Sequence, residues 1–221
     1  MSALSAREGY ALWAPQYDAE TVVSALENRL VESLGVATKD RRLLDVGCGT
    51  GRRLRDTDAA SAVGVDPSLA MLARASREQP LVAGDVRALS FAAEAFDVIW
   101  CRLVVGHVRE VDVVYAELAR VCRTGGAVIV SDLCAEAVAA GHRRTFRDER
   151  GVRHELEHFV HTLDRQAGVA ANAGLALDAH REGVIDAHVR PYYADAGRLH
   201  AYEEQRGLPL VTALVWRKRG A

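Results

Sequence analysis

LLDVGCGTGRRL, the stretch from Leu43 to Leu54, decides the fold of this chain. An apolar run leads directly into three glycines, Gly47, Gly49 and Gly51, and we expect a helix after them. Because glycine lacks a Cβ atom, such a loop can turn tightly and let a ligand approach the backbone. Several kinds of loop use this glycine spacing, so the flanking segments must indicate what it binds.

Short apolar runs alternate with helical patterns on both sides of the glycine loop. Near-continuous apolar strands that alternate with helices are typical of a parallel sheet covered by helices on both faces. The sequence therefore predicts a doubly wound α/β fold. The expected strands are Arg42–Val46, Ala62–Asp66, Leu81–Asp85, Phe96–Cys101 and Ala127–Asp132, and the expected helices are 20–34, Leu69–Arg77 and Val111–Val121.

The character of the sequence changes beyond Asp132. Residues 142–160 are polar and predict a hairpin that turns at Asp148–Gly151. A helix capped by Thr162 is expected next. Two strands after it should form an antiparallel hairpin at an edge of the main sheet. The ranges are Thr162–Ala173 for the helix, Leu175–Arg181 and Leu210–Lys218 for the strands, and 183–207 for the excursion between them.

The composition indicates one globular domain over residues 1–221, with 49% hydrophobic residues and a formal net charge of −2. This balance excludes a mainly disordered chain and argues against bulk nucleic-acid binding, which needs a basic face. The apolar runs are far shorter than the roughly 20 residues that cross a bilayer. MSALSAREGY has no signal-peptide core, so a cytoplasmic protein is expected. Four cysteines without a CxxC pair predict no metal site.

Carboxylates recur where the predicted strands end. Asp66, Asp85 and Asp132 each close an apolar run, and Asp45 lies inside the first run. The carboxyl ends of parallel strands meet at one edge, where doubly wound sheets bind their ligands. Asp66 lies 19 residues after Gly47, the position of a carboxylate that binds ribose hydroxyls. Asp85 can accept a hydrogen bond from an adenine amino group.

Two nucleotide ligands suit such a loop. NAD requires GxGxxG, with the pyrophosphate at the N-terminus of the helix. This chain has GxGxG instead, and Asp45 lies two residues before the first glycine. A carboxylate at that position repels a pyrophosphate but suits an ammonium or a sulfonium group. The residues therefore favour S-adenosylmethionine over a dinucleotide.

Five segments between residues 43 and 132 resemble the successive motifs of class I S-adenosylmethionine-dependent methyltransferases. The resemblance is to the small-molecule group that includes the ubiquinone and menaquinone methyltransferases. Thr124 stands where proline is commoner in that family. The segments are LLDVGCGTG, AVGVDPS with Asp66, AGDVRAL with Asp85, FDVIWCRLVVGHV at 96–108 and ELARVCRTGGAVIVSD at 117–132.

This resemblance implies a Rossmann-like fold with a mostly parallel seven-stranded sheet whose last strand is antiparallel. It implies a helical lid over 1–35, a cofactor-binding half over 40–132 and a substrate side over 133–221. S-adenosylmethionine would be the cofactor and S-adenosylhomocysteine the product. The implied cofactor contacts are Tyr10, Trp13, Tyr17, Asp45, Gly47, Cys48, Gly49, Gly51, Asp66, Pro67, Asp85, Val86, Cys101, Arg102 and Leu103.

Histidines are the candidate general bases. Methyl transfer from a sulfonium mainly needs alignment and exclusion of water, but some acceptors benefit from a base. Histidine titrates nearest neutral pH. We expect catalytic or substrate-binding roles for His107, His158 and His161, with structural, exposed or interface positions as the alternatives. Nearby arginines either bind an acidic substrate or cofactor tail or form a solvated face: Arg143, Arg144, Arg147, Arg150 and Arg153.

The expected function is methyl transfer from S-adenosylmethionine to a small-molecule acceptor at oxygen, nitrogen or carbon, with specialised metabolism as one setting. CRLVVG after the fourth strand lacks the motif with which amino-group DNA methyltransferases bind a flipped base, and Cys101 follows Trp100 rather than the proline of cytosine C5 enzymes. The alternatives are methylation of RNA or protein, and a non-methylating cofactor-binding protein on the same fold. No membrane partner is expected, and the hairpin at 142–160 is the first candidate for a homodimer contact.

Overall fold

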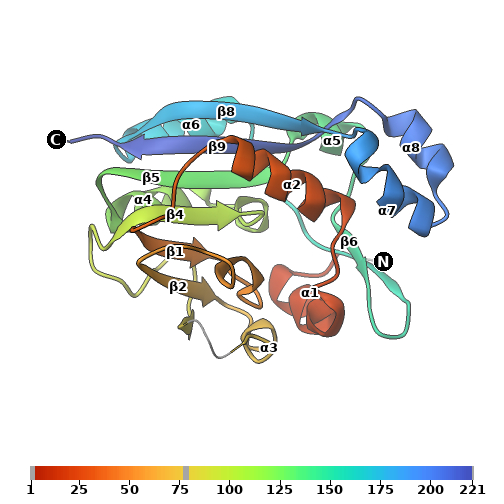
Figure 1. Cartoon of the computed structure of the whole chain (residues 1–221), viewed down its shortest axis with the longest axis horizontal. Helices are drawn as coiled ribbons and strands as arrows, with labels where there is room; N and C mark the ends of the chain where they lie inside the picture. Colours follow the sequence, from red (N-terminus) through yellow and green to blue (C-terminus); the bar gives the residue numbers. More distant parts are fainter. Residues whose placement is uncertain (1–2, 77–79, 221) are drawn as a thin grey trace.

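A computed structural model describes residues 3–76 and 80–220, and within them seven strands form one sheet in the order β3-β2-β1-β4-β5-β9-β8 (Figure 1). Neighbouring strands are parallel except at β9, which is antiparallel to β5 and β8. The predicted fold class is confirmed. The strands are β1 (Arg42–Val46), β2 (Ser61–Asp66), β3 (Leu81–Ala83), β4 (Phe96–Arg102), β5 (Cys122–Leu133), β8 (Leu175–Val184) and β9 (Pro209–Lys218), with β6 (Thr145–Arg147) and β7 (Arg153–Glu155) in a separate hairpin.

Helices cover both faces of the sheet. α4 and α6 pack together on one face, and α2 packs on the other face against β5, β8 and β9. In the part of the chain that the structure describes, no helix is both long and apolar enough to span a membrane. The helices are α1 (Ala6–Trp13), α2 (Val22–Ser33), α3 (Leu69–Leu72), α4 (Val111–Val121), α5 (Ala135–Ala139), α6 (Leu163–Asn172), α7 (Arg190–Asp195) and α8 (Leu199–Gln205).

The apolar run in β5 is continuous because both of its faces are buried. Successive side chains of a strand point to opposite sides of the sheet. Val128 and Val130 pack with Leu118 of α4, while Ile129 packs with Leu26 of α2. All five side chains are at most 1% exposed. Burying a side chain of this size stabilises the fold by about 1.5–3 kcal/mol, so apolar residues are required on both faces.

Several predicted boundaries are wrong. The helix expected after Gly51 is a single 3-10 turn, η2 (Arg52–Leu54), because Leu54 is its only buried residue. The helix expected over Leu69–Arg77 ends at Leu72, and Arg77 lies outside the described residues. β3 stops at Ala83 because the chain turns at Gly84 and Asp85, whereas β5 is longer than predicted. The excursion 183–207 holds α7 and α8.

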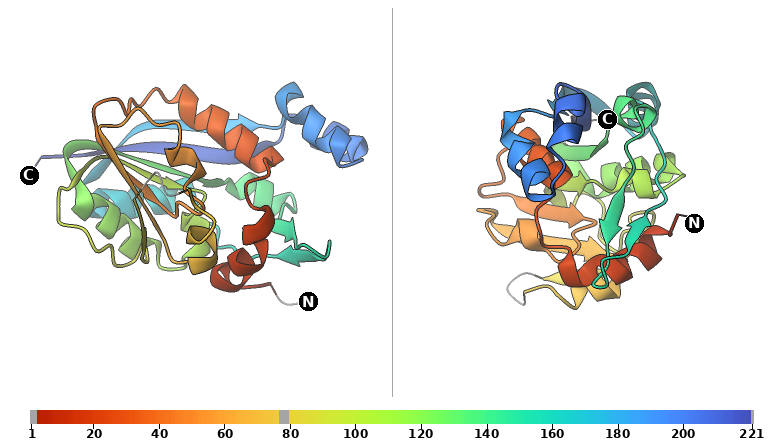
Figure 2. Two further views of the ribbon diagram at one scale, coloured as in Figure 1. Left: turned by 60° about the horizontal axis from the view of Figure 1, so that its bottom comes forward. Right: turned by 90° about the vertical axis from the view of Figure 1, so that its right-hand side faces the viewer.

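α1, the β6–β7 hairpin, α7 and α8 gather at the end of the sheet to which the parallel strands point (Figure 1, Figure 2). α1 lies there against the β6–β7 hairpin. The Leu4 backbone bonds to Glu155 and Glu157, at 2.8 Å each, and the Trp13 ring stacks on Phe146 with centroids 5.0 Å apart. Of the lid predicted over 1–35, residues 5–17 lie at this edge and α2 packs on the sheet, while residues 1–2 lie outside the described residues.

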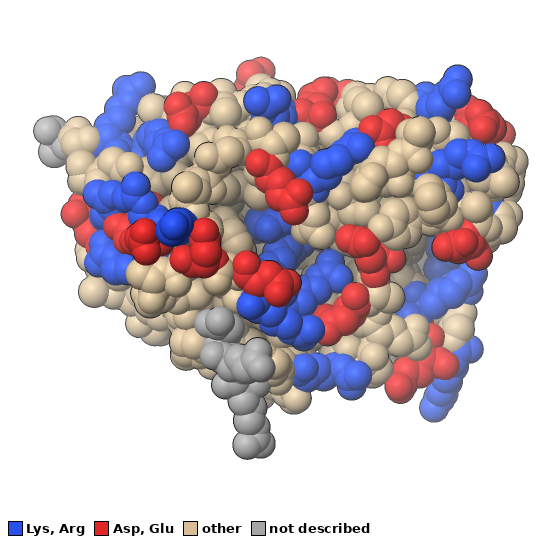
Figure 3. All heavy atoms as spheres, viewed as in Figure 1, with Lys and Arg blue, Asp and Glu red and all other residues tan. Residues whose placement is uncertain are grey.

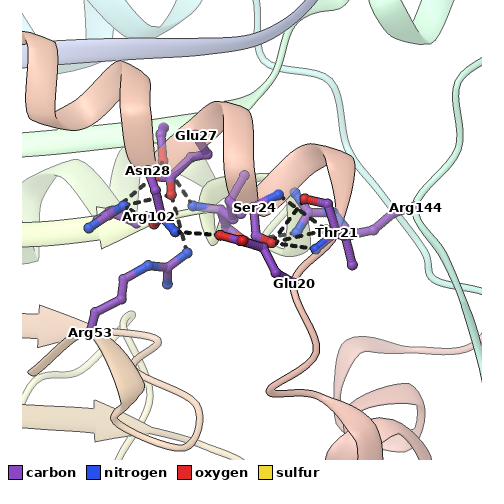
Figure 4. Close-up of polar contacts among 10 residues, drawn as sticks. Glu20, Thr21, Ser24, Glu27, Asn28, Arg53, Arg102 and Arg144 are labelled. Atoms are coloured by element: carbon purple, nitrogen blue, oxygen red, sulfur yellow. Dashed lines mark hydrogen bonds and ion pairs between the residues drawn. The ribbon is translucent and has the colours of Figure 1, made fainter. Parts of the chain in front are cut away.

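Glu27 ties α2 to three other elements (Figure 4). Its carboxylate is fully buried and accepts hydrogen bonds from Arg102 Nε (2.8 Å), Arg102 Nη2 (2.7 Å) and Ser131 Oγ (2.6 Å). Arg53 Nη2 of η2 lies 3.3 Å away. Burial acts to raise the pKa of Glu27, but the charges of Arg102 and Arg53 and the hydrogen bonds outweigh it and lower this pKa to about 2.

Glu27→Gln should lower the free energy of unfolding by about 3 kcal/mol at pH 7, because the lowered pKa reflects how strongly the folded state favours the carboxylate. The folded pKa of about 2 lies below the ordinary value of 4.5. The stabilisation is therefore complete well above pH 4.5 and is lost as the pH falls towards 2. Urea denaturation should show the difference between wild type and variant narrowing by about 2 kcal/mol from pH 7 to pH 3.

Glu32→Gln is the matched control, since Glu32 lies on the exposed side of the same helix. It should change the free energy of unfolding by less than about 0.5 kcal/mol. A Glu27→Gln variant as stable as wild type at pH 7, or a stability difference that does not change with pH, would contradict this role of Glu27.

Candidate functional site

The glycine loop after β1 folds back on β2. Gly47 has a φ of +71°, and a Cβ atom there would lie 2.3 Å from Val104 Cγ2. Its backbone N–H donates to the Val65 carbonyl at 2.7 Å. Gly49, with a φ of +59°, donates its N–H to Asp66 Oδ2 at 2.8 Å. Only glycine suits such a conformation and so close an approach, so these two glycines let the loop pack tightly against Val104 and the end of β2.

A cavity of about 350 Å³ lies between this loop and α1, and we call it the glycine-loop cavity. Its volume is within the range of small-ligand pockets. It opens at the carboxyl ends of β1, β2 and β4, where the sequence predicts the cofactor. The predicted cofactor residues that line it are Tyr10, Tyr17, Gly47, Gly49, Asp66, Pro67, Asp85, Val86, Arg102 and Leu103.

The other predicted cofactor residues lie outside this cavity. Trp13 is on the side of α1 that meets the hairpin. Cys48 and Cys101 are 3% and 0% exposed, because their side chains point into the protein interior. A Cβ atom on Gly51 would meet Leu81 rather than the cavity. Cys48, Gly51 and Cys101 thus belong to the loop and the core behind it, whereas Trp13 lines a neighbouring cavity.

Asp45 is buried directly behind the glycine loop. Both of its carboxylate oxygens lack a hydrogen-bond partner within the described residues. Burial raises the pKa of Asp45 to about 6, although the charges of Arg53 and Arg102 act to lower it. A buried carboxylate without a partner is costly, so an added donor or cation beside it would be stabilising. The loop therefore has the polarity for a cationic group and not for a pyrophosphate.

Asp66 and Asp85 differ in how their carboxylates are engaged. Asp66 accepts backbone N–H bonds from Gly49 and Ser68, each at 2.8 Å, and burial raises its pKa. Asp85 is bound by its neighbour Arg87, through Nε at 2.9 Å and Nη2 at 2.5 Å, which lowers its pKa. Arg87 also lines the cavity, a contact that the sequence analysis missed.

Tyr10 and His107 meet at the wall of the glycine-loop cavity. The Tyr10 hydroxyl lies 2.9 Å from His107 Nε2. Burial, followed by the charge of Arg144, lowers the pKa of His107 to about 3. The imidazole is therefore neutral near pH 7, and its Nε2 can accept a hydrogen bond from the Tyr10 hydroxyl. Burial raises the pKa of Tyr10 far above its usual range, so that hydroxyl stays protonated.

Asp132, at the end of β5, binds the segments around this pair. Its Oδ1 accepts from Arg144 Nη2 at 2.5 Å and lies 2.9 Å from His158 Nε2, and its Oδ2 accepts the Gly106 N–H at 2.6 Å. Burial acts to raise the pKa of Asp132, but Arg144 and His158 outweigh it and lower this pKa. His158 thus contacts Asp132 and does not line the glycine-loop cavity.

The predicted histidines therefore divide into three positions. His107 lines the cavity and His158 lies behind Asp132, whereas His161 bonds to the Val108 carbonyl at 2.8 Å and lines another hollow, beside Cys134. Of the hairpin arginines, Arg144 is not on a solvated face, since its side chain is 10% exposed. Sequence reasoning had no signal to separate Arg144 from its neighbours, because both Arg143 and Arg144 precede the same short strand.

A second cavity of about 260 Å³ adjoins the first and shares Tyr10, Tyr17 and Leu103 with it. Leu103 has a φ of +61°, a conformation that costs a non-glycine residue roughly 1–3 kcal/mol. Its carbonyl accepts from Arg144 Nη1 at 3.0 Å, which helps hold it between the two cavities. We call this second hollow the arginine cavity, after its lining residues Arg52, Arg53, Arg143, Arg144 and Arg198.

Comparisons with known proteins agree with this geometry. A family model described as a methyltransferase domain matches residues 44–130. A malonyl-acyl-carrier-protein O-methyltransferase from Enterobacter lignolyticus is 30% identical over 171 residues, which is 73% of this chain and 64% of that protein. A demethylmenaquinone methyltransferase from Renibacterium salmoninarum is 34% identical over 129 residues, 54% of each protein. The matches span about half the length of the curated relatives.

Solved structures share the fold. An S-adenosylmethionine-dependent methyltransferase from Mesorhizobium loti has a TM-score of 0.64 at 19% identity, over 85% of this chain and 95% of that one. The cyclase SpnF has a TM-score of 0.66 at 19% identity, over 100% of this chain and 98% of that one. At these identities the likeness shows the fold alone.

His107 should remain neutral from pH 8 down to about pH 4, because burial and Arg144 lower its pKa to about 3. Its folded pKa lies below the ordinary value of 6.5, so folding opposes its protonation and this histidine costs stability as the pH falls below 6.5. Nitrogen-detected NMR of the imidazole, assigned with a His107→Gln variant, measures the titration. An N-acetylhistidine amide in the same tube is the control. A titration midpoint of His107 between pH 6 and 7 would contradict the lowered pKa and show that the imidazole is exposed to water.

Proposed function

Since residues 44–130 belong to the methyltransferase domain family and the fold is that of class I S-adenosylmethionine-dependent methyltransferases, we propose that this protein transfers the methyl group of S-adenosylmethionine to a small-molecule acceptor. The observation that carries this proposal is the glycine-loop cavity, which is lined by Gly47, Gly49 and Asp66 and has behind it Asp45, whose carboxylate has no partner among the described residues. A curated demethylmenaquinone methyltransferase among the relatives supports a small acceptor.

The residues of the cavity fit the parts of this cofactor. We assign the ribose hydroxyls to Asp66, whose oxygens keep free lone pairs beside their backbone bonds. Asp85 and Val86 are assigned to the adenine, and Gly47 and Gly49 to the methionine end, where the charge of Asp45 suits a cationic group. When bound, the cofactor supplies a methyl group already activated for in-line displacement.

The protein's own contribution to such a transfer is alignment and exclusion of water. Tyr10, Tyr17 and Leu103 line both cavities, so they would flank the line between methyl donor and acceptor. We assign His107 a positioning role, because it is a weak base that accepts a hydrogen bond from Tyr10. His158 would act through Asp132 in holding the same wall. His161 lines neither cavity and takes no part in this proposal.

Asp66→Ala should weaken the binding of S-adenosylhomocysteine at least a hundredfold, because it removes two hydrogen-bonded oxygens from the cavity wall. Calorimetric titration of wild type should give one-to-one binding of both S-adenosylmethionine and S-adenosylhomocysteine. Asp178→Ala is the matched control, since Asp178 lies on β8 at the far edge of the sheet and should leave both affinities unchanged. Equal affinities for wild type and Asp66→Ala would refute the assignment of the cavity.

Transfer to a small molecule is tested with methyl-labelled cofactor and a cell extract separated into small molecules, RNA and protein. The proposal expects label in the small-molecule fraction together with release of S-adenosylhomocysteine. Label only in RNA or protein would replace the proposed acceptor class with a macromolecule. Consumption of a compound without release of S-adenosylhomocysteine would indicate a non-methylating activity on the same fold.

A further inference from the structure

The arginine cavity carries charge of one sign. Of the 221 residues 30 are acidic, yet within residues 3–76 and 80–220 no aspartate or glutamate lines this cavity. The outer surface differs, because acidic and basic side chains are intermixed on the face seen in Figure 3. The hollow therefore differs in charge from the face seen in Figure 3.

Two of these arginines have an explanation in the proposed function. Arg52 and Arg53 follow the glycine loop directly, and the cofactor brings a carboxylate of its own to that loop. Arg53 also lies 3.3 Å from Glu27 Oε2, which offsets its charge. The remaining basic residues come from the hairpin segment and from the excursion before β9, and the cofactor does not account for them.

Arg144 is buried with one donor unused. Its Nη1 and Nη2 donate to the Leu103 carbonyl and to Asp132, but its Nε has no partner within the described residues. Figure 4 shows the side chain extending towards Thr21 at the start of α2, and both residues line the arginine cavity. Asp132 and the Tyr10 hydroxyl both act on this guanidinium and stabilise its charge, so the arginine is held in place in the cavity wall.

Arg143, Arg198 and His142 also line the arginine cavity. Arg143 Nη1 donates to the Val138 and His142 carbonyls at 3.0 and 2.8 Å, and its Nε lies 3.9 Å from Glu155, whereas Arg198 pairs with no carboxylate in the part of the chain described. Burial, and then the charge of Arg198, lowers the pKa of His142, so its ring is neutral near pH 7 and can donate an N–H. Arginine binds carboxylates and phosphates in preference to other groups, because its donors match two oxygens at once.

An apolar wall faces these donors. Val22 and Val23 of α2, Leu133 of β5 and Leu210 of β9 line the same cavity. A ligand that fills the arginine cavity therefore contacts both apolar side chains and cationic hydrogen-bond donors. An acid with an apolar body matches both parts, whereas a neutral polar molecule or a cation matches neither.

The geometry points to an anionic small molecule, a carboxylate or phosphate on an apolar body, as the methyl acceptor, with Arg143, Arg144 and Arg198 binding its charged group. This builds on the proposed function, because the shared wall of Tyr10, Tyr17 and Leu103 brings the acceptor beside the cofactor. Arg144 bonds to Leu103 of that wall, so the charged group of the acceptor would be bound within reach of the cofactor.

Calorimetric titration with three probes of equal length tests the charge requirement. Octanoate and octyl phosphate should bind to the protein saturated with S-adenosylhomocysteine, and octanamide should bind at least tenfold more weakly than the better anion. Arg143→Gln combined with Arg198→Gln should weaken anion binding at least tenfold while the affinity for S-adenosylhomocysteine stays within twofold of wild type. That second affinity also shows that the variant is folded.

Arg150→Gln combined with Arg206→Gln is the matched control, since it removes one exposed arginine from each of the same two segments without touching the cavity lining. It should change anion binding by less than twofold. The inference is wrong if octanamide binds as well as the anions, if no anion binds, or if both double variants behave alike. Failure of S-adenosylhomocysteine to bind folded wild type would instead overturn the proposed function, and the acceptor assignment with it.

Anion exchange separates the two sources of negative charge. Small-molecule extract that accepts labelled methyl groups should be retained by an anion-exchange resin at pH 7. Loss of acceptor activity after phosphatase treatment identifies a phosphate, and persistence identifies a carboxylate. Acceptor activity in the unretained fraction would contradict an anionic acceptor while leaving methyl transfer itself intact.

Discussion

The carboxylate of Asp132 is the group on which the architecture of the site depends. It ends β5, and it binds the hairpin through Arg144, the turn after β4 through the Gly106 N–H, and the chain after the hairpin through His158. Each of these segments buries few apolar side chains, such as Val105 after β4 and Phe146 in the hairpin. A fully desolvated carboxylate gives them a common partner, because leaving it unpaired would cost several kcal/mol.

Three buried carboxylates at the sheet, Glu27, Asp132 and Asp45, differ in whether they are paired with arginines. Glu27 and Asp132 are each held by arginines, which lower their pKa values despite burial. Asp45 lies between Arg53 and Arg102 in the same region, yet it accepts no hydrogen bond within the described residues, and burial raises its pKa. The first two are satisfied by the protein and serve its stability. Asp45 keeps its oxygens free, which fits a position kept for a ligand.

The sequence predicted the sheet and the glycine-loop cavity because both depend on local patterns. The apolar runs that stop at Gly47 and Asp66 end where β1 and β2 end, and parallel pairing brings those ends together. Arg144 and His107 could not be assigned in this way, since their environments arise from segments far apart in the chain: Asp132 lies 12 residues from Arg144, and Tyr10 lies 97 residues from His107. The helix predicted after Gly51 is only the short η2 turn, because Leu54 is its one side chain buried in the core.

The attachment of α1 to the hairpin couples the two cavities. α1 walls the glycine-loop cavity, and the segment leading into the hairpin walls the arginine cavity. Leu4 pairs with the chain around Leu156, and Gly9 lets the helix lie on that leucine, where a Cβ atom would come within 2.0 Å of its Cδ2. One attachment therefore fixes a wall of each cavity, so a substitution that loosens it would disturb both.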